Sequence, residues 1–337
     1  MKNSRLIVVL GMHRSGTSAL TRGLQVMGVR LGDRMIPPIE GNNSKGFWED
    51  IDLNNLNTAI LRSIGSSWNH LEPITLNDVE TLRNKGYFLR AFELLRQKVG
   101  DAPVFGVKDP RIPKLLPFWK GVFSHCQFDV SYILAVRHPL SVAKSLGKRD
   151  GFDSGKSYLL WLGHVLTSLT DIVGEKRVVV DYDRLMESPD REMIRIAKCV
   201  NLEIDPKALQ FYKTEFLDQG LRHTVYDPDD LLLDNACPPI VHEVYTALLD
   251  VAADKANLDD VELQEKVARW SEEFERLKPL MGVIDRLNAQ LAVVYNSPSW
   301  KITWPLRVMA RQLQRAKRRI ELVVCAITRV GGVKNMF

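Results

Sequence analysis

The chain has 337 residues, of which 45% are hydrophobic, so it can bury the core of one main domain and carry an appendage. Its net charge of +5 is unevenly placed: residues 298–337 hold nine basic residues and one acidic residue, which leaves −3 for the rest. Contacts with anionic surfaces are therefore expected only of this tail, and nucleic acid is not expected as a partner. The hydrophobic run at 6–10 is too short for a signal-peptide core or a membrane span, which favours a cytoplasmic protein.

The cysteines are scattered along the chain without paired spacing, at Cys126, Cys199, Cys237 and Cys325. This distribution fits neither a zinc site nor a disulfide framework and is typical of a reducing compartment. The sequence shows no cluster of metal-ligating residues, and we expect no metal.

Short apolar runs alternate with amphipathic patterns through the first 220 residues. The apolar runs predict strands at 5–10, 104–107, 130–136 and 177–180. The amphipathic patterns predict helices at 17–27, 139–148, 156–172 and 191–200. Strands that alternate with helices favour an α/β fold with a doubly wound, mostly parallel sheet covered on both faces.

The pattern changes after about residue 220. Residues 222–239 are rich in Asp and Pro and are expected to form a loop. Beyond them, apolar residues recur at three- and four-residue spacing, which predicts a C-terminal α-helical appendage, either a helical hairpin or a short coiled coil. This stripe contains Val261, Val267, Trp270, Phe274, Leu277, Met281, Ile284, Leu287 and Leu291. We therefore expect a domain at 1–220, a linker and helical region at 221–297, and a basic amphipathic tail at 298–337.

The first motif follows the strand at 5–10 and opens the helix at 17–27. It reads Gly11-Met12-His13-Arg14-Ser15-Gly16-Thr17-Ser18. A strand, a glycine loop and a helix in this order hold phosphate, because backbone N–H groups and the positive end of the helix point at the anion. The spacing matches the P-loop pattern G-x-x-x-x-G, but Thr17 stands where nucleoside triphosphatases have a lysine. That substitution favours a donor with fewer charges at the scissile group than a triphosphate has.

This loop resembles the 5′-phosphosulfate loop of sulfotransferases, and it is most similar to that of Golgi-type and bacterial members, including tyrosylprotein sulfotransferases. The resemblance implies a P-loop-type fold and 3′-phosphoadenosine-5′-phosphosulfate as the donor co-substrate. It also implies that Arg14 lies against the transferring sulfuryl group. The donor-binding residues that it implies in this loop are Gly11, His13, Arg14, Ser15, Gly16, Thr17 and Ser18.

The second motif runs from Arg137 to Ser145, directly after the strand at 130–136. It resembles the family's 3′-phosphate-binding motif, in which an arginine ends a strand and a serine follows eight residues later in the next helix. Arg137 supplies a permanently charged, forked donor, which suits a phosphate. His138 stands where the family commonly has Asp, outside the two ligand positions.

Two further motifs resemble those of the family and bear on the chemistry. Lys108-Asp109-Pro110 is similar to a K-D-P motif of tyrosylprotein sulfotransferases, whose lysine helps to hold the sulfuryl and bridging oxygens, a role that the resemblance gives to Lys108. Gly46-Phe47-Trp48-Glu49-Asp50 resembles the G-[FY]-W-E stretch of bacterial members.

Transfer to a hydroxyl needs a base to accept the proton. Golgi-type members use glutamate, so Glu49 is the candidate base. Asp50 is the second candidate, followed by His13 and Glu40.

Other readings of the sequence remain open. Asp181, in a stretch that looks like the strand-terminal Y-[ED]-x-L of bacterial sulfotransferases, can also be a Walker B acid, which keeps a P-loop small-molecule kinase as an alternative. A second alternative is a non-catalytic glycan-assembly partner that keeps the fold and uses its helices as an interface.

The C-terminal segment bears on the acceptor and on partners. Residues 296–307 look like a tail found on bacterial glycosyltransferases and glycan-assembly proteins, which favours a sugar hydroxyl on a glycan or glycolipid as acceptor. The basic tail, with Trp300 and Trp304, suits peripheral contact with an anionic membrane at its cytoplasmic face. The alternative is that the tail packs on its own domain or on a partner subunit, as in a homo-oligomer formed through the C-terminal helices.

Overall fold

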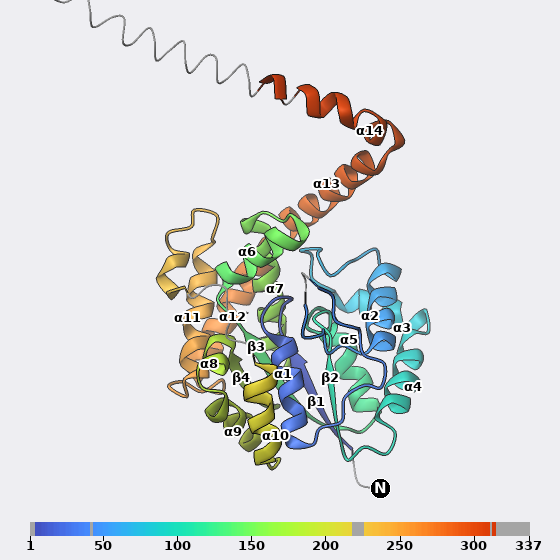
Figure 1. Ribbon diagram of the computed structural model, residues 1–337. Coiled ribbons are helices and arrows are strands. Elements are labelled where there is room, and N and C mark those ends of the chain that lie inside the picture. The colour runs from blue at the N-terminus through green and yellow to red at the C-terminus, as the bar shows by residue number, and fades with distance from the viewer. Residues whose placement is uncertain (1–3, 41–42, 218–225, 311, 315–337) are drawn as a thin grey trace, which may run out of the picture. The chain divides into compact units, whose positions relative to one another are not determined.

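The computed structural model describes residues 4–40, 43–217, 226–310 and 312–314 (Figure 1). The chain divides into two compact units, Met1–Met281 and Gly282–Phe337. Each unit is described by itself below.

The centre of the first unit is a four-stranded sheet in the order β2-β1-β3-β4, with every neighbouring pair parallel. The strands are β1 (Arg5–Leu10), β2 (Val104–Lys108), β3 (Asp129–Val136) and β4 (Lys176–Asp181). All four strands predicted from the sequence are thereby confirmed, and so is the parallel α/β fold. In register, Val8 lies opposite Val107 on one side and Tyr132 on the other. The carboxyl ends of the strands therefore meet at one edge.

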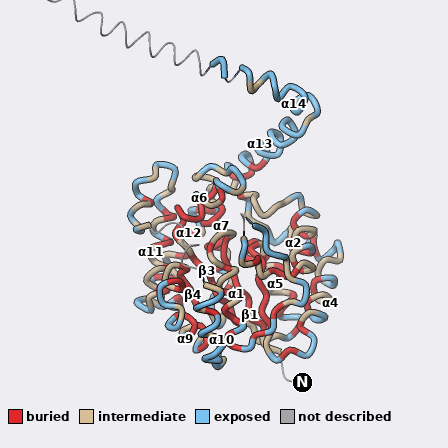
Figure 2. The backbone as a smooth tube through the Cα atoms, viewed as in Figure 1, coloured by how far each residue is buried: buried red, intermediate tan, exposed pale blue. Residues whose placement is uncertain are grey.

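The sheet is covered on both faces, as its alternating side chains require. Leu6 and Val8 of β1 face one core together with α5 (Ile112–His125) and α7 (Ser154–Asp171). Ile7 and Val9 face a second core with α1 (Thr17–Gly23) and α9 (Pro189–Val200). Figure 2 shows the strands as largely buried, at the centre of the first unit. The two cores explain why β1 reads as an unbroken apolar run.

Between α1 and β2 the chain contains a 3₁₀ turn and three helices. They are Leu24–Met27, α2 (Ile51–Ser63), α3 (Leu76–Asn84) and α4 (Tyr87–Val99). The expected helix at 17–27 is thus α1 followed by the 3₁₀ turn, and it ends at Gly28 as predicted. Helices α2 to α4 were not among the sequence predictions.

The later helices of this unit include two that the sequence did not predict, at 182–187 and 206–211. Besides α5, α7 and α9, these later helices are α6 (Pro139–Asp150), α8 (Tyr182–Glu187), α10 (Pro206–Phe211), α11 (Pro239–Ala252) and α12 (Val261–Arg276). A π-helical turn at Tyr212–Phe216 extends α10.

Helix α12 belongs to the core of the first unit. Trp270 and Phe274 are buried there, and a Cβ on Gly163 of α7 would lie 3.0 Å from the Phe274 ring. The first part of the apolar stripe expected to form a hairpin or coiled coil therefore packs on α7. The compact unit extends to Met281, beyond the boundary expected at residue 220.

The second unit contains most of α13 (Lys278–Asn296) and α14 (Pro298–Ile302). Ser297 caps α14 by accepting a hydrogen bond from the Trp300 N–H. The later residues of the apolar stripe, Ile284, Leu287 and Leu291, are exposed. Most of the basic residues of the tail lie outside the described residues. Across the part of the chain that the structure describes, no helix combines the length and apolar character needed to cross a bilayer.

Candidate functional site

The motifs found in the sequence come together at the carboxyl edge of the sheet. The loop from Gly11 follows β1, Lys108 ends β2, and Arg137 follows β3 directly. The Arg14 Nε donates a hydrogen bond of 2.7 Å to Ser145 Oγ, and Arg137 Nη1 donates one of 3.2 Å to the Arg14 carbonyl oxygen. The two segments expected to bind the donor's phosphates are therefore in direct contact, which the sequence could only suggest.

The glycines of the first loop are required by its backbone path. Gly11 has φ 145° and Gly16 has φ 80°, which are angles that favour glycine. A Cβ on Gly11 would lie 2.7 Å from the Ala135 carbonyl oxygen, and one on Gly16 would lie 2.1 Å from the Tyr182 ring. The loop therefore runs tightly against β3 and α8. Arg14, between the two glycines, also has a positive φ of 71°, an uncommon conformation for a residue with a side chain.

Several polar atoms around this loop are buried without a hydrogen-bond partner among the described residues. They are Ser15 Oγ, His13 Nε2 and Arg137 Nε. Most buried polar atoms in proteins are hydrogen-bonded, so a group of such atoms on one loop and the neighbouring strand end is informative. An anion that accepts hydrogen bonds at this place would satisfy donors that the protein leaves unused.

The site also gathers positive charge. Burial, followed by repulsion from Arg149 and Arg137, lowers the pKa of Arg14. Burial, followed by repulsion from Arg111 and Arg149, lowers the pKa of His13 well below its ordinary value. His13 is therefore a neutral imidazole near neutral pH, and its ring lies 4.4 Å from that of Trp68. An anion bound here would relieve the repulsion among the guanidinium groups.

The residues of the second motif have distinct surroundings. The Arg137 guanidinium lies over the Tyr182 ring, 4.6 Å from its centre. His138 caps α6 by accepting a hydrogen bond from the Leu140 N–H through Nδ1, while Nε2 donates to the Asp227 carbonyl oxygen at 3.0 Å. His138 thus links the segment around Asp227 to the start of α6, and Arg137 and Ser145 are the residues of this motif that hydrogen-bond with Arg14.

Lys108 and Glu49 form a buried ion pair. The Lys108 Nζ lies 2.7 Å from Glu49 Oε1, and the two side chains are 2% and 6% exposed. The same ammonium donates to the Phe47 carbonyl oxygen at 2.8 Å and lies 3.4 Å from Ser18 Oγ. Ser18 belongs to α1, which follows the first loop, so the structure links the first, third and fourth motifs through one ammonium group.

Glu49 has further partners that the sequence did not indicate. The Asn54 amide donates to Glu49 Oε2 at 2.9 Å, and Arg111 Nη1 lies 3.9 Å from the same oxygen. Asp109 accepts hydrogen bonds from Arg111 and from Asn57, and so braces the end of β2. Asn54 lies one turn into α2. Because the sequence analysis did not predict that helix, it gave no reason to place Asn54 beside Glu49.

The other candidate bases are placed differently. Asp50 caps α2, accepting hydrogen bonds from the Asp52 and Leu53 N–H groups, and its second oxygen lies 3.0 Å from Lys98 Nζ. Glu40 is exposed. Glu49 is therefore the carboxylate that pairs with Lys108.

Asp50 also belongs to an acidic group with Asp33 and Asp52 whose oxygens lie within 4.8 Å of one another. The Lys98 ammonium forms ion pairs with all three carboxylates. Burial lowers the pKa of Lys98, but the hydrogen bonds that its ammonium donates to these carboxylates outweigh that effect and raise the pKa. The Lys98 ammonium therefore offsets part of the negative charge of this acidic group.

Asp181, the residue behind the kinase alternative, ends β4 and caps α8 by accepting a hydrogen bond from the Arg184 N–H at 3.0 Å. Burial raises its pKa to about 6. Its position at a strand end fits either reading of the motif.

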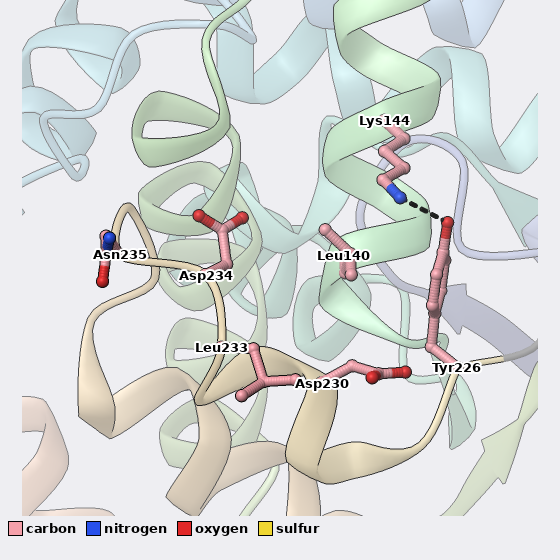
Figure 3. A pocket seen from close by; sticks show the side chains of 7 residues that line it. All are labelled: Leu140, Lys144, Tyr226, Asp230, Leu233, Asp234 and Asn235. Carbon is pink, nitrogen blue, oxygen red and sulfur yellow. Dashed lines mark hydrogen bonds between the residues drawn. The ribbon is translucent and has the colours of Figure 1, made fainter.

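Two surface hollows are present elsewhere in the first unit. One, of about 560 Å³, lies beside α6 and is shown in Figure 3, where Leu140 and Lys144 project from the helix toward Tyr226 and Asp230. The other is lined by residues around Lys176, at the opposite end of β4 from Asp181. Neither lining contains a residue that the sequence motifs assigned to the donor or to the chemistry.

No protein-family model matches the chain. No curated protein matches it in sequence. Among solved structures, it is similar to the sulfotransferase domain of the Synechococcus PCC 7002 olefin synthase, with 18% identity, a TM-score of 0.41, and coverage of 82% of this chain and 96% of that domain. It is also similar to the sulfotransferase domain from the curacin biosynthetic pathway, with 17% identity, a TM-score of 0.39, and coverage of 82% and 99%. For the sulfotransferase STF1 from Mycobacterium tuberculosis H37Rv, the identity is 14%, the TM-score is 0.37, and the coverage is 66% and 74%. These three solved structures are sulfotransferases or sulfotransferase domains. Because the identities and TM-scores are this low, we infer the function of the chain from the residues of the site.

Proposed function

We propose that the chain is a sulfotransferase that moves a sulfuryl group from 3′-phosphoadenosine-5′-phosphosulfate to an acceptor hydroxyl. The observation that carries the proposal is the meeting of three strand-end motifs, joined by the Arg14–Ser145 hydrogen bond, with the buried Lys108–Glu49 pair beside the same loop. The motifs resemble those of sulfotransferases, and because they lie close together, a role in the reaction can be proposed for each of their charged residues.

The residues present fit such a donor. Gly11 and Gly16 form a cradle that a Cβ would fill, and Ser15 Oγ and Arg137 Nε are buried donors without partners among the described residues. When bound, the donor supplies the sulfuryl group and leaves as 3′-phosphoadenosine-5′-phosphate. In this proposal Gly11, His13, Ser15, Gly16, Thr17 and Ser18 hold the 5′ side of the donor together with Arg14.

Arg137 and Ser145 hold the 3′-phosphate in this proposal. Arg137 has a guanidinium whose fork matches a phosphate, and the stacking on Tyr182 fixes its plane. Ser145 Oγ lies within hydrogen-bond reach of Arg14, which places it between the two phosphate-binding segments. Recognition of the 3′-phosphate would separate this donor from nucleotides that lack it.

Arg14 and Lys108 orient the reacting group and stabilise its charge. Both are cations held within the site, and a donor aimed at developing charge in a water-poor site is typically worth about 3–4 kcal/mol of barrier. Lys108 already contacts both Ser18, in the first turn of α1, and the proposed base Glu49. A lysine supplied from β2 offers a physical reason why the loop itself can carry Thr17 where a Walker lysine belongs.

Glu49 accepts the acceptor's proton in this proposal. Its carboxylate is held from two sides, by Lys108 at Oε1 and by Asn54 at Oε2, so its direction is fixed. Glu49 shares its Lys108 partner with Ser18 at the end of the first motif, whereas Asp50 pairs with Lys98, which favours Glu49 over Asp50. The reaction needs no metal in this scheme, because guanidinium and ammonium groups carry the charge stabilisation.

We further propose that the acceptor is a glycan or glycolipid hydroxyl and that the basic tail holds the protein at the cytoplasmic face of an anionic membrane. The support is the tail-like sequence at 296–307 and the exposed apolar side chains of Trp304, Leu306 and Met309 next to Arg307. A homo-oligomer formed through α13 is the competing use of this region, supported by the exposed Leu287 and Leu291.

Isothermal titration tests the donor proposal against the kinase alternative. The protein is titrated separately with 3′-phosphoadenosine-5′-phosphate and with ATP and magnesium. We expect tight binding of the first and weak or no binding of the second. Preferential binding of ATP with magnesium would support a kinase, and binding of neither would support a non-catalytic partner.

A further inference from the structure

The segment that carries Glu49 contains a left-handed residue. Trp48, directly before Glu49, has φ 56°, a conformation that side chains rarely adopt and that costs free energy unless the surroundings hold it. On either side of it, the Phe47 carbonyl oxygen and Glu49 Oε1 accept hydrogen bonds from the same Lys108 ammonium. The left-handed turn at Trp48 therefore lets the residues before and after it both accept hydrogen bonds from the Lys108 ammonium.

The Trp48 side chain is held from outside this segment. The Arg22 guanidinium lies 5.5 Å from the centre of the Trp48 ring, and it is also 5.9 Å from Phe211 and 5.6 Å from Phe216. The Phe216 ring meets Trp48 edge-on at 5.8 Å. A guanidinium that lies over aromatic rings is attracted by the ring quadrupoles. This attraction becomes stronger when the guanidinium is removed from water. Burial does lower the pKa of Arg22.

Arg22 lies in the last turn of α1, the helix that begins at the end of the first loop. The same helix supplies Ser18, whose hydroxyl donates to the Phe47 carbonyl oxygen at 2.9 Å. Helix α1 thus contacts the Glu49 segment at two places, through Ser18 near its start and through Arg22 near its end.

We propose that Arg22 is a positioning residue for the reaction: its guanidinium, enclosed with Phe216, holds Trp48 in the left-handed conformation that sets Glu49 against Lys108. The kinetic consequence rests on the proposed function, since it requires Glu49 to act as the base. The structural consequence, a fixed segment at 43–50, does not.

The test compares Arg22→Ala, Arg22→Lys and a matched control, Arg90→Ala. Arg90 lies over the Tyr87 ring at 5.1 Å on α4, so its removal also deletes an arginine–aromatic contact, but one that none of the site residues shares. Hydrogen exchange of residues 43–50 is measured in each protein, together with affinity for 3′-phosphoadenosine-5′-phosphate. Arg22→Ala is expected to speed exchange in 43–50 while β1 to β4 exchange as in the parent, whereas Arg22→Lys and Arg90→Ala leave it unchanged.

The kinetic readout separates positioning from binding. Misplacement of a catalytic group by about 1 Å can cost on the order of 100-fold in rate, so Arg22→Ala is expected to lower kcat by about 10–100-fold with little change in KM for the donor. Arg22→Lys, which keeps a cation, is expected to restore most of kcat. Should Arg22→Ala fail to fold, Phe216→Leu opens the same enclosure without removing the charge and is expected to speed exchange in 43–50.

Unchanged exchange in 43–50 for Arg22→Ala or its substitute Phe216→Leu would overturn the proposal, as would a kcat equal to that of Arg90→Ala. If the parent protein transfers no sulfuryl group while Arg22→Ala still speeds exchange in 43–50, the proposed function fails and the positioning role of Arg22 stands.

Discussion

The Lys108 ammonium lies 2.7 Å from the Glu49 carboxylate, and both side chains are almost wholly buried. Lys108 ends β2, whereas Glu49 precedes α2, so the pair joins segments 59 residues apart in the sequence. In the proposed reaction one partner stabilises charge on the transferring group and the other takes the proton. Their contact places the charge-stabilising ammonium and the proton-accepting carboxylate next to each other, beside the first loop.

Removing the two partners should have different effects on stability. Lys108→Ala leaves a buried carboxylate without its ammonium and should destabilise the protein by about 3–5 kcal/mol, because breaking one side of a buried pair leaves an uncompensated charge. Glu49→Gln keeps the shape and an acceptor oxygen for Lys108, and should destabilise it less. Both should lower turnover, Lys108→Ala by about 10²–10³-fold. Denaturant unfolding and sulfuryl-transfer kinetics check the two parts.

Affinity for 3′-phosphoadenosine-5′-phosphate should be nearly unchanged in Glu49→Gln, because the base does not hold the nucleotide. Near-normal turnover of this variant across pH would place the base elsewhere. In that case Asp50→Asn is the next variant to examine. This substitution also removes the ion pair between Asp50 and Lys98.

Arg14 should matter for rate more than for folding. Its guanidinium is partly exposed and its own charge is disfavoured by Arg149 and Arg137, so Arg14→Ala should not destabilise the protein strongly. Turnover should fall by about 10²–10³-fold, as for the loss of one donor aimed at developing charge. Kinetics alongside thermal unfolding measure both. A large loss of stability with unchanged turnover would contradict the role given to Arg14.

Asp181 should make stability depend on pH. Burial raises its pKa to about 6, above the ordinary value of an aspartate, so the folded protein holds this proton more tightly than the unfolded chain does. The stability from this group is present at about pH 4 and is lost as the pH rises through about 6. Asp181→Asn keeps an N-cap oxygen for the Arg184 N–H and should stabilise the protein by about 1–3 kcal/mol at about pH 8 relative to its effect at about pH 4. Urea unfolding of both proteins at the two pH values decides this, and an equal effect at both would refute it.

The fold could be predicted because its signals are local. Each strand is a short apolar run, such as Ile7 to Val9 in β1, which is buried on two faces, and the predicted helices at 17–27 and 139–148 each follow a strand. The stripe at 261–291 could not be divided in advance. Its spacing is the same on both sides of Met281, but Trp270 and Phe274 find α7 to pack against, whereas Leu287 and Leu291 remain exposed. Periodicity indicates an apolar face and not what covers it.

The candidate site could also be predicted in part from local sequence signals. Arg14, Lys108 and Arg137 stand at strand ends, and parallel strands bring their carboxyl ends together. Asn54 and Arg22 could not be predicted, because each acts through a contact made only after α1, α2 and the turn at Trp48 are in place. An asparagine beside a carboxylate or an arginine near aromatic residues has no sequence pattern of its own.

The basic tail should bind anionic membranes reversibly. Each basic residue near such a surface contributes roughly 1 kcal/mol, and salt screens the attraction beyond a Debye length of about 8 Å. The full-length protein should co-sediment with anionic liposomes at low salt and be released at high salt. A shortened protein ending at Asn296 should bind nucleotide normally and fail to sediment. If neither protein binds the liposomes, the tail serves in assembly instead.

The central claim is that this site recognises a 3′-phosphorylated sulfuryl donor, and Arg137→Ala tests it most directly. Isothermal titration compares the parent and the variant with 3′-phosphoadenosine-5′-phosphate and with adenosine 5′-phosphosulfate, which lacks the 3′-phosphate. We predict that the variant loses about 2–5 kcal/mol of binding free energy for the first ligand, as when one partner of a desolvated charge pair is removed, and much less for the second. Equal losses for the two ligands would contradict the assignment of Arg137, and with it the account of the donor site.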